Sequence, residues 1–261
     1  MIKLSISHVS FSYIDVPALH DIDLEIGGGE MVALLGPNGS GKTTLIKLAS
    51  GVLRPRGGEI HLDGSSLRRL KRREIAQKIA VVPQLFHMPF AFTLREVALL
   101  GRTPFLKTFS NEEEWDQQVV DSAMEQTGIA QLGQRFFNEL SGGERQKGIL
   151  AMALAQEPKL LLMDEPTAHL DINHQMEILE LVKGLNCEKG ITVIGAMHDL
   201  NLAALYFDRL VLLKEGRIFA DGPPSDVLTE ETIREVFTAS VLVKQHPSMR
   251  TPYIVITPKR T

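Results

Sequence analysis

Cysteines and long apolar runs are scarce in this 261-residue sequence. The single cysteine, Cys187, excludes an intrachain disulfide framework and a zinc site built from paired cysteines. The longest run of apolar residues, from Ile149 to Ala155, has seven residues, whereas a helix that spans a membrane needs about twenty. The first residues also lack the apolar segment of a secretory signal peptide. We therefore expect an intracellular protein that reaches a membrane only through a partner.

A large excess of charge of one sign is also absent. The 28 Lys and Arg residues and the 32 Asp and Glu residues give a formal net charge of −4. Proteins that bind mainly nucleic-acid phosphate or anionic lipid carry an excess of positive charge. The composition therefore predicts no nucleic-acid partner. The run of charged residues from Arg68 to Glu74 is interpreted as a solvated helix face.

Two patterns of apolar residues indicate the fold. From Leu4 to Ile26 apolar residues alternate with polar ones, which is typical of half-buried antiparallel strands. Later apolar runs are unbroken, which is typical of strands covered on both faces of a parallel sheet. These runs are Met31–Leu35, Leu160–Met163, Ile191–Ile194 and Leu210–Leu213, and helical patterns at Lys42–Ser50, Ser141–Gln156 and His174–Leu185 lie between them. We predict an α/β fold with a parallel sheet, an N-terminal antiparallel β subdomain and a helical subdomain inserted at about residues 85–156.

A phosphate-binding loop follows the first unbroken apolar run. Its residues match the pattern G-x-x-x-x-G-K-[ST] between a strand and a helix, which is the context that the motif requires. The glycines let backbone N–H groups surround phosphate oxygens, and the lysine adds a positive charge. A threonine hydroxyl is placed to bind Mg²⁺, and a second can reach another phosphate oxygen. The motif is Gly36-Pro37-Asn38-Gly39-Ser40-Gly41-Lys42-Thr43, followed by Thr44.

Two carboxylates end the apolar run Leu160–Met163. Neighbouring side chains on a strand point to opposite faces, so Asp164 and Glu165 are expected to have different roles. Asp164 fits the Mg²⁺-binding carboxylate of a phosphate-binding-loop enzyme, and Glu165 is placed to polarise the attacking water.

A second helix start with exposed amides lies at Leu140-Ser141-Gly142-Gly143-Glu144. Ser141 is a natural N-cap, and the two glycines leave amides free to bind an anion. These five residues, together with the phosphate-binding loop and Asp164-Glu165, resemble the ATP-binding-cassette (ABC) ATPases. The resemblance covers about residues 2–238 and implies a P-loop NTPase core, with residues 239–261 as a short C-terminal extension.

The resemblance implies roles for four further residues. Tyr13 matches an aromatic that stacks on adenine, and Gln84 matches a glutamine that reaches Mg²⁺ and the attacking water. Asp171 matches a loop that contacts a second copy of the chain, and His198 matches a histidine that contacts the γ-phosphate. The resemblance also implies a head-to-tail homodimer in which two ATP molecules lie between Lys42 of one chain and Ser141 of the other.

The sequence around Gln84 is similar to that of one subgroup of importer subunits. Residues Arg73–Gln84, Val97–Pro104 and His198–Ala204 resemble the ATPase subunits of iron-siderophore, haem and cobalamin importers. This resemblance implies a membrane permease, a separate solute-binding protein and a place on the cytoplasmic face of the cell membrane. We interpret the apolar stretch Leu85–Lys107 as the docking face for the permease.

Three alternatives remain open at this point. Residues Met88–Phe92 also resemble importer subunits associated with oxyanions such as molybdate. A soluble ABC ATPase of DNA repair or translation usually has a long coiled-coil insert or a second cassette, and this sequence has neither. A nucleotide-binding switch without turnover would not require Glu165, Gln84 and His198 together.

Overall fold

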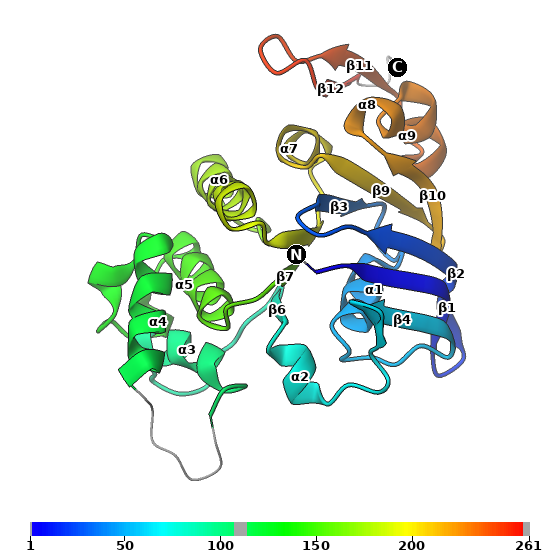
Figure 1. Ribbon diagram of the computed structural model, residues 1–261. Helices are drawn as coiled ribbons and strands as arrows, with labels where there is room; N and C mark the ends of the chain where they lie inside the picture. The colour runs from blue at the N-terminus through cyan, green and yellow to red at the C-terminus, as the bar shows by residue number, and fades with distance from the viewer. Residues whose placement is uncertain (1, 107–113, 258–261) are drawn as a thin grey trace.

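The computed structural model describes residues 2–106 and 114–257. Its centre is a six-stranded sheet in the order β10-β9-β3-β8-β7-β6 (Figure 1). The strands from β9 to β6 are parallel, and β10 runs antiparallel to β9. In chain order the bounds are β3 Met31–Leu35, β6 Ile79–Val82, β7 Leu160–Asp164, β8 Thr192–Ala196, β9 Arg209–Lys214 and β10 Arg217–Gly222.

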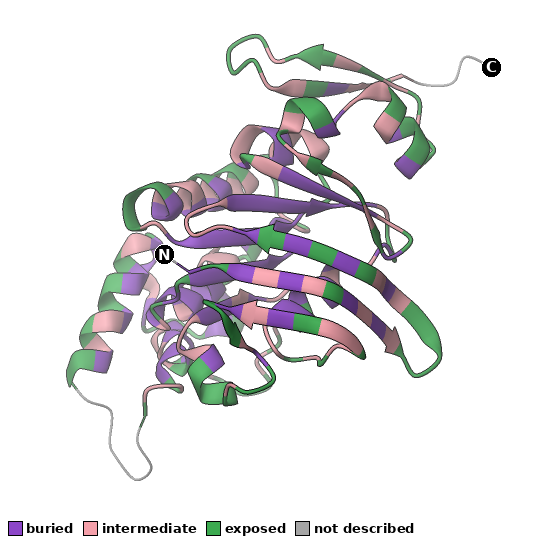
Figure 2. Ribbon diagram, turned by 45° about the vertical axis from the view of Figure 1, so that its right-hand side comes forward, coloured by how far each residue is buried: buried purple, intermediate pink, exposed green. Residues whose placement is uncertain are grey.

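A second, antiparallel sheet is built from the N-terminal part of the chain, in the order β2-β1-β4-β5. Burial alternates along its strands, as Figure 2 shows, because one face covers the core and the other meets solvent. The period of two in the sequence predicted this arrangement. The strands are β1 Leu4–Tyr13, β2 Val16–Ile26, β4 Gly57–Leu62 and β5 Ser65–Ser66.

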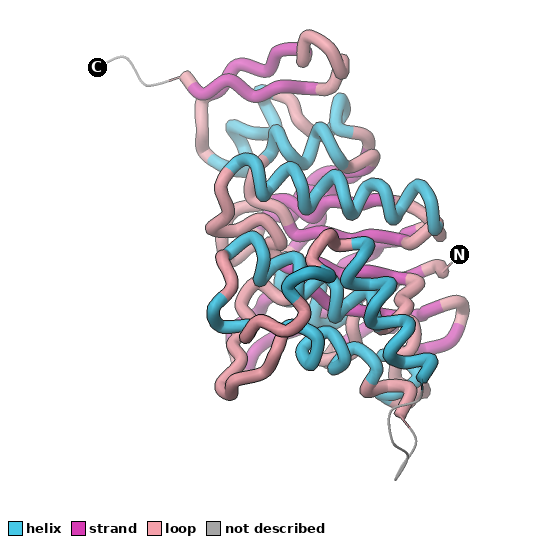
Figure 3. The backbone as a smooth tube through the Cα atoms, turned by 90° about the vertical axis from the view of Figure 1, so that its left-hand side faces the viewer, coloured by secondary structure: helices cyan, strands magenta, loops and turns pink. Residues whose placement is uncertain are grey.

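The central strands are buried on both faces, as their unbroken apolar runs predict. Alternate residues of β3 enter two different cores: Met31, Ala33 and Leu35 face one, and Val32 and Leu34 face the other. The first core lies under α6 and α7, and the second lies between the central sheet, α1 and the antiparallel sheet. Figure 3 shows the helices of the first core in front of the strands. Helix α1 (Lys42–Ala49) belongs to the second core, and α6 (Ile172–Lys189) and α7 (Leu200–Tyr206) belong to the first.

Helices replace strands in the middle of the chain and form a lobe beside the core (Figures 1 and 3). Arg102 is buried in this lobe, where its guanidinium bonds Asp116 Oδ1 at 2.7 Å, Ala155 O at 2.7 Å and Glu157 Oε2 at 2.8 Å. The predicted fold class, including the inserted helices, is confirmed. The elements, from the connection out of the core onward, are α2 Arg72–Ala76, α3 Leu94–Leu99, η1 Leu100–Arg102, α4 Glu114–Gln126, η2 Ala130–Leu132, η3 Phe137–Glu139 and α5 Gly142–Ala155.

A small hairpin ends the described chain. Strands β11 (Val241–Gln245) and β12 (Pro252–Ile256) pair with each other after helices α8 (Pro224–Val227) and α9 (Glu230–Phe237). The Asn201 amide of α7 holds the hairpin by two bonds to the backbone of Ile254, at 2.7 and 3.2 Å. Among the residues described, no helix combines the length and the apolar character that a bilayer span requires.

Candidate functional site

The order of the parallel strands brings four separate segments to one edge of the sheet. Strands β6, β7, β8 and β3 lie side by side and point the same way. The segments that follow their carboxyl ends therefore meet, which is the usual place for a ligand in such a sheet. These segments carry Gln84, Asp164 with Glu165, His198 and the loop 36–41.

The loop 36–41 curls so tightly that glycine is required at two of its turns. Gly36 has φ +143°, and a Cβ there would lie 2.2 Å from the carbonyl oxygen of Leu213. Gly41 has φ +106°, and a Cβ there would lie 2.5 Å from the Leu19 side chain. Because L-residues rarely adopt such φ angles, the glycines of the motif are needed for the shape of the loop itself.

Lys42 opens helix α1 and points its ammonium group back into this loop. Its Nζ donates to the carbonyl oxygens of Gly36 at 2.7 Å and Pro37 at 3.2 Å. Burial lowers the pKa of Lys42, while the negative charges of Glu165 and Asp164 act in the opposite direction. Nearby, the buried Ser40 Oγ has no hydrogen-bond partner among the described residues. An anion seated in the loop would supply acceptors for both groups, so these residues fit a nucleotide phosphate.

Thr43 links helix α1 to the end of β7. Its Oγ1 donates to Asp164 Oδ1 at 2.9 Å. Burial raises the pKa of Asp164, although the hydrogen bond from Thr43 and the nearby lysine charges oppose this shift. A hydroxyl and a carboxylate oxygen are ligands that Mg²⁺ prefers, and a bound cation would favour the charged form of the carboxylate. The pair therefore fits a magnesium ion.

Glu165 lies where three segments converge. One carboxylate oxygen accepts a hydrogen bond from the Gln84 amide, and the other contacts Nε2 of His198. Glu165 also leaves β7 with a φ of +53°, so its side chain does not follow the strand alternation that Asp164 ends. The two carboxylates therefore have different contacts: Asp164 bonds the helix after the loop, and Glu165 bonds the residues that follow the neighbouring strands.

These groups border a cavity of about 650 Å³. The phosphate-binding loop forms one wall and Gln84, Glu165 and His198 form another. Tyr13 lines this cavity and has 43% of its surface exposed. The cavity also includes Val16, Pro17 and Ala18, which belong to none of the sequence motifs. These residues lie on β2, which pairs with the strand that carries Tyr13, and this closeness to Tyr13 is the signal that could have identified them.

The second glycine-rich helix start lies apart from this cavity. Ser141 caps α5 by accepting from the Glu144 N–H at 3.3 Å, and the Glu144 carboxylate accepts from the Ser141 N–H at 2.8 Å. None of residues 141–144 is among the described residues that line this cavity. Ser141 and Gly142 are exposed. The predicted N-cap is confirmed, and one copy of the chain does not bring its two glycine-rich helix starts together.

Asp171 lies beside that second helix start. It caps α6 by accepting from the His174 N–H at 2.9 Å, and its carboxylate also bonds His174 Nδ1 at 2.8 Å. These bonds lower the pKa of Asp171. The His174 ring in turn packs on the backbone of Gly143, where a Cβ would lie 2.2 Å from the ring. The contacts of His174 with Asp171 and Gly143 therefore join the two helix starts beneath the exposed Ser141, Gly142 and Asp171.

Apolar residues of the predicted docking stretch differ in how far they are exposed. Phe86, Met88 and Phe92 pack against the core, and the ring of Phe86 meets that of Phe137 edge to face at 5.6 Å. Leu85 and Phe90 are exposed, by 67% and 69%. The docking face at Leu85–Lys107 stays a prediction, to which Leu85 and Phe90 contribute exposed side chains, and Lys107 lies outside the described residues.

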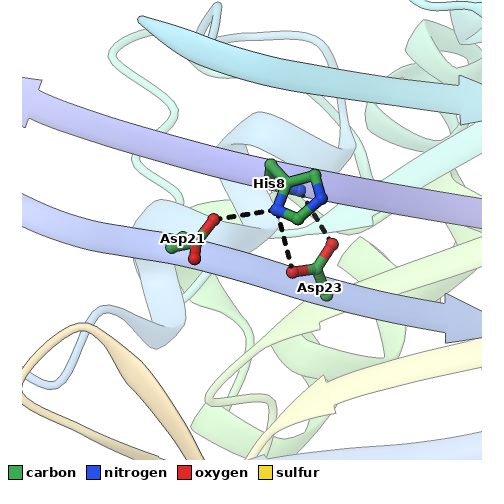
Figure 4. Close-up of side chains that lie close together, drawn as sticks. All are labelled: His8, Asp21 and Asp23. Atoms are coloured by element: carbon green, nitrogen blue, oxygen red, sulfur yellow. Dashed lines mark hydrogen bonds and ion pairs between the residues drawn. The ribbon is translucent and has the colours of Figure 1, made fainter.

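Three potential ligand groups also meet on the outer face of the antiparallel sheet. His8 Nδ1 lies 3.0 Å from Asp21 Oδ1 and 3.4 Å from Asp23 Oδ2 (Figure 4). The hydrogen bond to Asp21, followed by the charges of Asp23 and Asp21, raises the pKa of His8. All three side chains are exposed, and none of them lines the nucleotide-sized cavity.

A parallel sheet with this loop after β3 and two carboxylates at the end of β7, with β8 between these strands, defines a P-loop NTPase. Residues 19–168 match the ABC transporter family. The chain belongs to this family. Over 98% of its length it is 39% identical to the petrobactin import ATP-binding protein FpuC of Bacillus anthracis, of which it covers 93%.

Two other relatives are longer than this chain. It is 41% identical, over 97% of its length, to an uncharacterized ABC transporter ATP-binding protein of Bacillus subtilis, YvrA, and covers 57% of that protein. It is 42% identical, over 93% of its length, to the cobalamin import ATP-binding protein BtuD of Halobacterium salinarum, and covers 61% of it. The chain thus spans about three fifths of the length of these two relatives.

A solved structure shares the fold over almost the whole chain. It is an inward-facing metal-chelate type ABC transporter, with a TM-score of 0.87 and 30% sequence identity. The alignment covers 99% of this chain and 98% of the other. The antiparallel sheet, the core, the helical lobe and the C-terminal hairpin therefore all lie within the matched length.

Proposed function

We propose that this chain hydrolyses ATP and powers an ABC importer of metal chelates such as iron-siderophore, haem or cobalamin. The observation that carries the proposal is the position of Glu165. It contacts both Gln84 and His198 and lines the same cavity as the lysine of the phosphate-binding loop. A carboxylate held by two neighbouring strand ends is suited to orient and activate a water molecule.

Each group of the cavity has a role in this reaction. The loop amides and Lys42 bind the phosphates, Thr44 reaches another phosphate oxygen, and Tyr13 stacks on the adenine. Thr43, Asp164 and Gln84 would hold Mg²⁺, which neutralises charge on the phosphates when bound. Glu165 accepts a hydrogen bond from the attacking water, and His198 contacts the γ-phosphate. The γ-phosphoryl group passes to this water, and ADP leaves.

The proposed partners depend on where the remaining motif residues lie. Five residues lie outside the cavity of their own copy and would complete the ATP site of a second copy of the chain. They are Ser141, Gly142, Gly143, Glu144 and Asp171. Membrane permease subunits would dock at the exposed part of the stretch 85–107, and a separate solute-binding protein would deliver cargo. The chain would then work at the cytoplasmic face of the membrane.

The cargo proposal rests on the relatives. The B. anthracis relative is named for petrobactin import and the H. salinarum relative for cobalamin import, and the solved neighbour is described as a metal-chelate type transporter. The corresponding division of the chain is an ABC ATPase domain at 2–238, with helices inserted at about 85–156, and an extension at 239–261.

The test is ATP binding and hydrolysis by the purified chain and its Glu165→Gln variant. The substitution keeps the size of the side chain but removes the carboxylate, so hydrolysis should fall by about 100- to 10,000-fold, the scale of a lost general base. The affinity for ATP should stay within about twofold. An equal loss of ATP affinity and turnover would show that Glu165 has no separate role in activating water.

A further inference from the structure

The basic residues of the chain are unevenly distributed. Seven of the 28 fall between positions 54 and 73, with two acidic residues among them, although the net charge of the chain is −4. All seven are exposed, and the helix α2 begins only at Arg72, so most of this cluster lies on loops and not on the predicted helix face. The seven are Arg54, Arg56, Arg68, Arg69, Lys71, Arg72 and Arg73.

The positive charge of this cluster is not compensated within the described part of the chain. None of the ion pairs there involves a residue between 54 and 73 other than His61 and Glu59, which pair with each other. Three of the guanidinium groups bond neutral carbonyl oxygens instead: Arg56 that of Ile14, Arg68 that of Pro55 at 2.9 Å, and Arg73 that of Pro104 at 2.7 Å. Carbonyl oxygens orient these side chains and leave their charge available to an anion.

Three of the arginines line one cavity of about 200 Å³. Arg54 comes from the loop after α1, Arg68 from the connection after β5, and Arg72 from the first turn of α2. The floor of the cavity is apolar, and Val52 at its rim is 67% exposed. The buried floor residues are Leu48, Ile60, Leu67 and Ile75. A hollow with a cationic rim and an apolar floor suits a molecule that is both anionic and amphiphilic.

We propose that this arginine cavity binds the phosphate of an anionic phospholipid headgroup. Guanidinium groups bind phosphate oxygens in pairs, which makes arginine better suited than lysine to such a site. The apolar floor and Val52 would contact the glycerol and the upper part of an acyl chain. Inorganic phosphate lacks the apolar part that the floor would contact, so we expect it to compete no better than chloride at the same ionic strength.

The place of the cavity in the fold agrees with a membrane surface. Arg73 Nε and Gln77 Nε2 both bond the carbonyl oxygen of Pro104, at 2.7 and 2.9 Å, which joins α2 to the end of the stretch 85–107. A permease docked on that stretch lies in the bilayer, so the adjoining arginines would face lipid beside it. This orientation rests on the proposed function, whereas the affinity of the cavity for an anionic lipid does not.

The test is sedimentation of the isolated chain with lipid vesicles. We expect binding to vesicles of phosphatidylcholine with phosphatidylglycerol and not to phosphatidylcholine alone, with a loss at high salt because surface charge is screened. The triple variant Arg54→Gln, Arg68→Gln, Arg72→Gln should bind about 100-fold more weakly, on the scale of roughly fivefold for each basic residue at a charged surface.

A matched variant removes the same charge elsewhere. This second triple variant changes exposed residues of β10 and the C-terminal hairpin and should retain vesicle binding. Its substitutions are Arg217→Gln, Lys244→Gln and Arg250→Gln. Equal weakening by both triple variants, or equal binding to the two kinds of vesicle, would overturn the proposal. So would release of the chain by inorganic phosphate beyond the effect of chloride at the same ionic strength, because the site would then take a soluble anion.

The outcome is independent of the ATP reaction. Vesicle binding needs neither nucleotide nor permease, so it can fail while Glu165-dependent hydrolysis is present, and the reverse can also occur. If the arginine variant binds vesicles like the native chain but no longer copurifies with a permease, the cavity recognises an acidic protein segment and the lipid proposal is wrong.

Discussion

The Oγ1 of Thr43 donates a hydrogen bond of 2.9 Å to Oδ1 of Asp164, across 121 residues of sequence. The bond joins the helix that follows the phosphate-binding loop to the end of strand β7, so two motifs that are separate in the sequence form one unit. The Asp164 carboxylate is largely buried, and this burial raises its pKa. This carboxylate is therefore costly to keep ionised until a cation is bound.

We predict that Asp164→Asn raises the melting temperature of the nucleotide-free chain at pH 7. A carboxyl whose folded pKa is raised stabilises the fold at a pH below its unfolded pKa, and that contribution is lost as the pH rises through the folded pKa. The neutral amide removes this loss, so the difference between variant and native chain should shrink in acid. Stabilisation by ATP with Mg²⁺ over ATP alone should disappear in the variant.

The matched control is Asp15→Asn, at an exposed turn residue. Thermal scans of this variant should follow those of the native chain at each pH, because an exposed carboxyl has little burial to relieve. A lower melting temperature for Asp164→Asn at neutral pH would mean that the hydrogen bond from Thr43 needs the full charge of the carboxylate.

Phe90 and Phe92 of the docking stretch differ in exposure, so we predict that the same substitution at each has a different effect. Phe90→Asp should detach the permease in copurification and leave the melting temperature unchanged, because this side chain is 69% exposed. Phe92→Asp should lower the melting temperature, because Phe92 packs against the core of the lobe. Ile256→Asp, at a side chain 82% exposed on the C-terminal hairpin, should retain the permease. Retention by Phe90→Asp would place the docking face elsewhere.

The separation of Ser141 from the nucleotide cavity predicts complementation between chains. In a Glu165→Gln background, Lys42→Ala and Ser141→Arg should each trap no ATP, because every shared site then has one broken half. Mixing them yields heterodimers with one intact site, so about one ATP should be trapped per heterodimer. The measurement is bound radiolabelled ATP after exchange of the chains.

Two controls define the complementation experiment. Ser225→Arg adds the same side chain at an exposed position away from the described cavity and should trap ATP like the parent. Chains carrying both Lys42→Ala and Ser141→Arg, mixed with themselves, should trap none. If fully exchanged mixtures of the single variants recover nothing, the two glycine-rich helix starts do not form a site across a dimer.

The His8 cluster predicts a histidine that titrates above its ordinary range. The hydrogen bond to Asp21 is the main cause of the raised pKa, and Asp23 adds to it. Asp21→Asn should therefore lower the pKa of His8 more than Asp23→Asn does, as measured by NMR titration of the ring. The stabilisation of the fold by charged His8 is present at a pH below its unfolded pKa and is lost as the pH rises through its folded pKa. Identical His8 titrations in all three chains would show that the cluster does not form in solution.

The residue pattern alone predicted the parts of the site that are contiguous in sequence. The phosphate-binding loop depends on glycines at particular turns and on Lys42 at the start of a helix, and these are local properties of the backbone. The cap at Ser141 is local for the same reason. The fold class followed from the contrast between alternating and unbroken apolar runs, because each run reports how many faces of its strand are covered.

Only the tertiary structure decided which distant groups meet. Gln84, Glu165 and His198 converge because β6, β7 and β8 are neighbours in the sheet, and apolar periodicity does not encode strand order. Resemblance to a family named these residues, but their mutual contacts come from the sheet. Burial likewise separated Phe92 from Phe90, and chain packing gathered Arg54, Arg68 and Arg72 around one cavity. A sequence determines the conformational preferences of its segments, whereas the distances between segments depend on how all of them bury their apolar faces together.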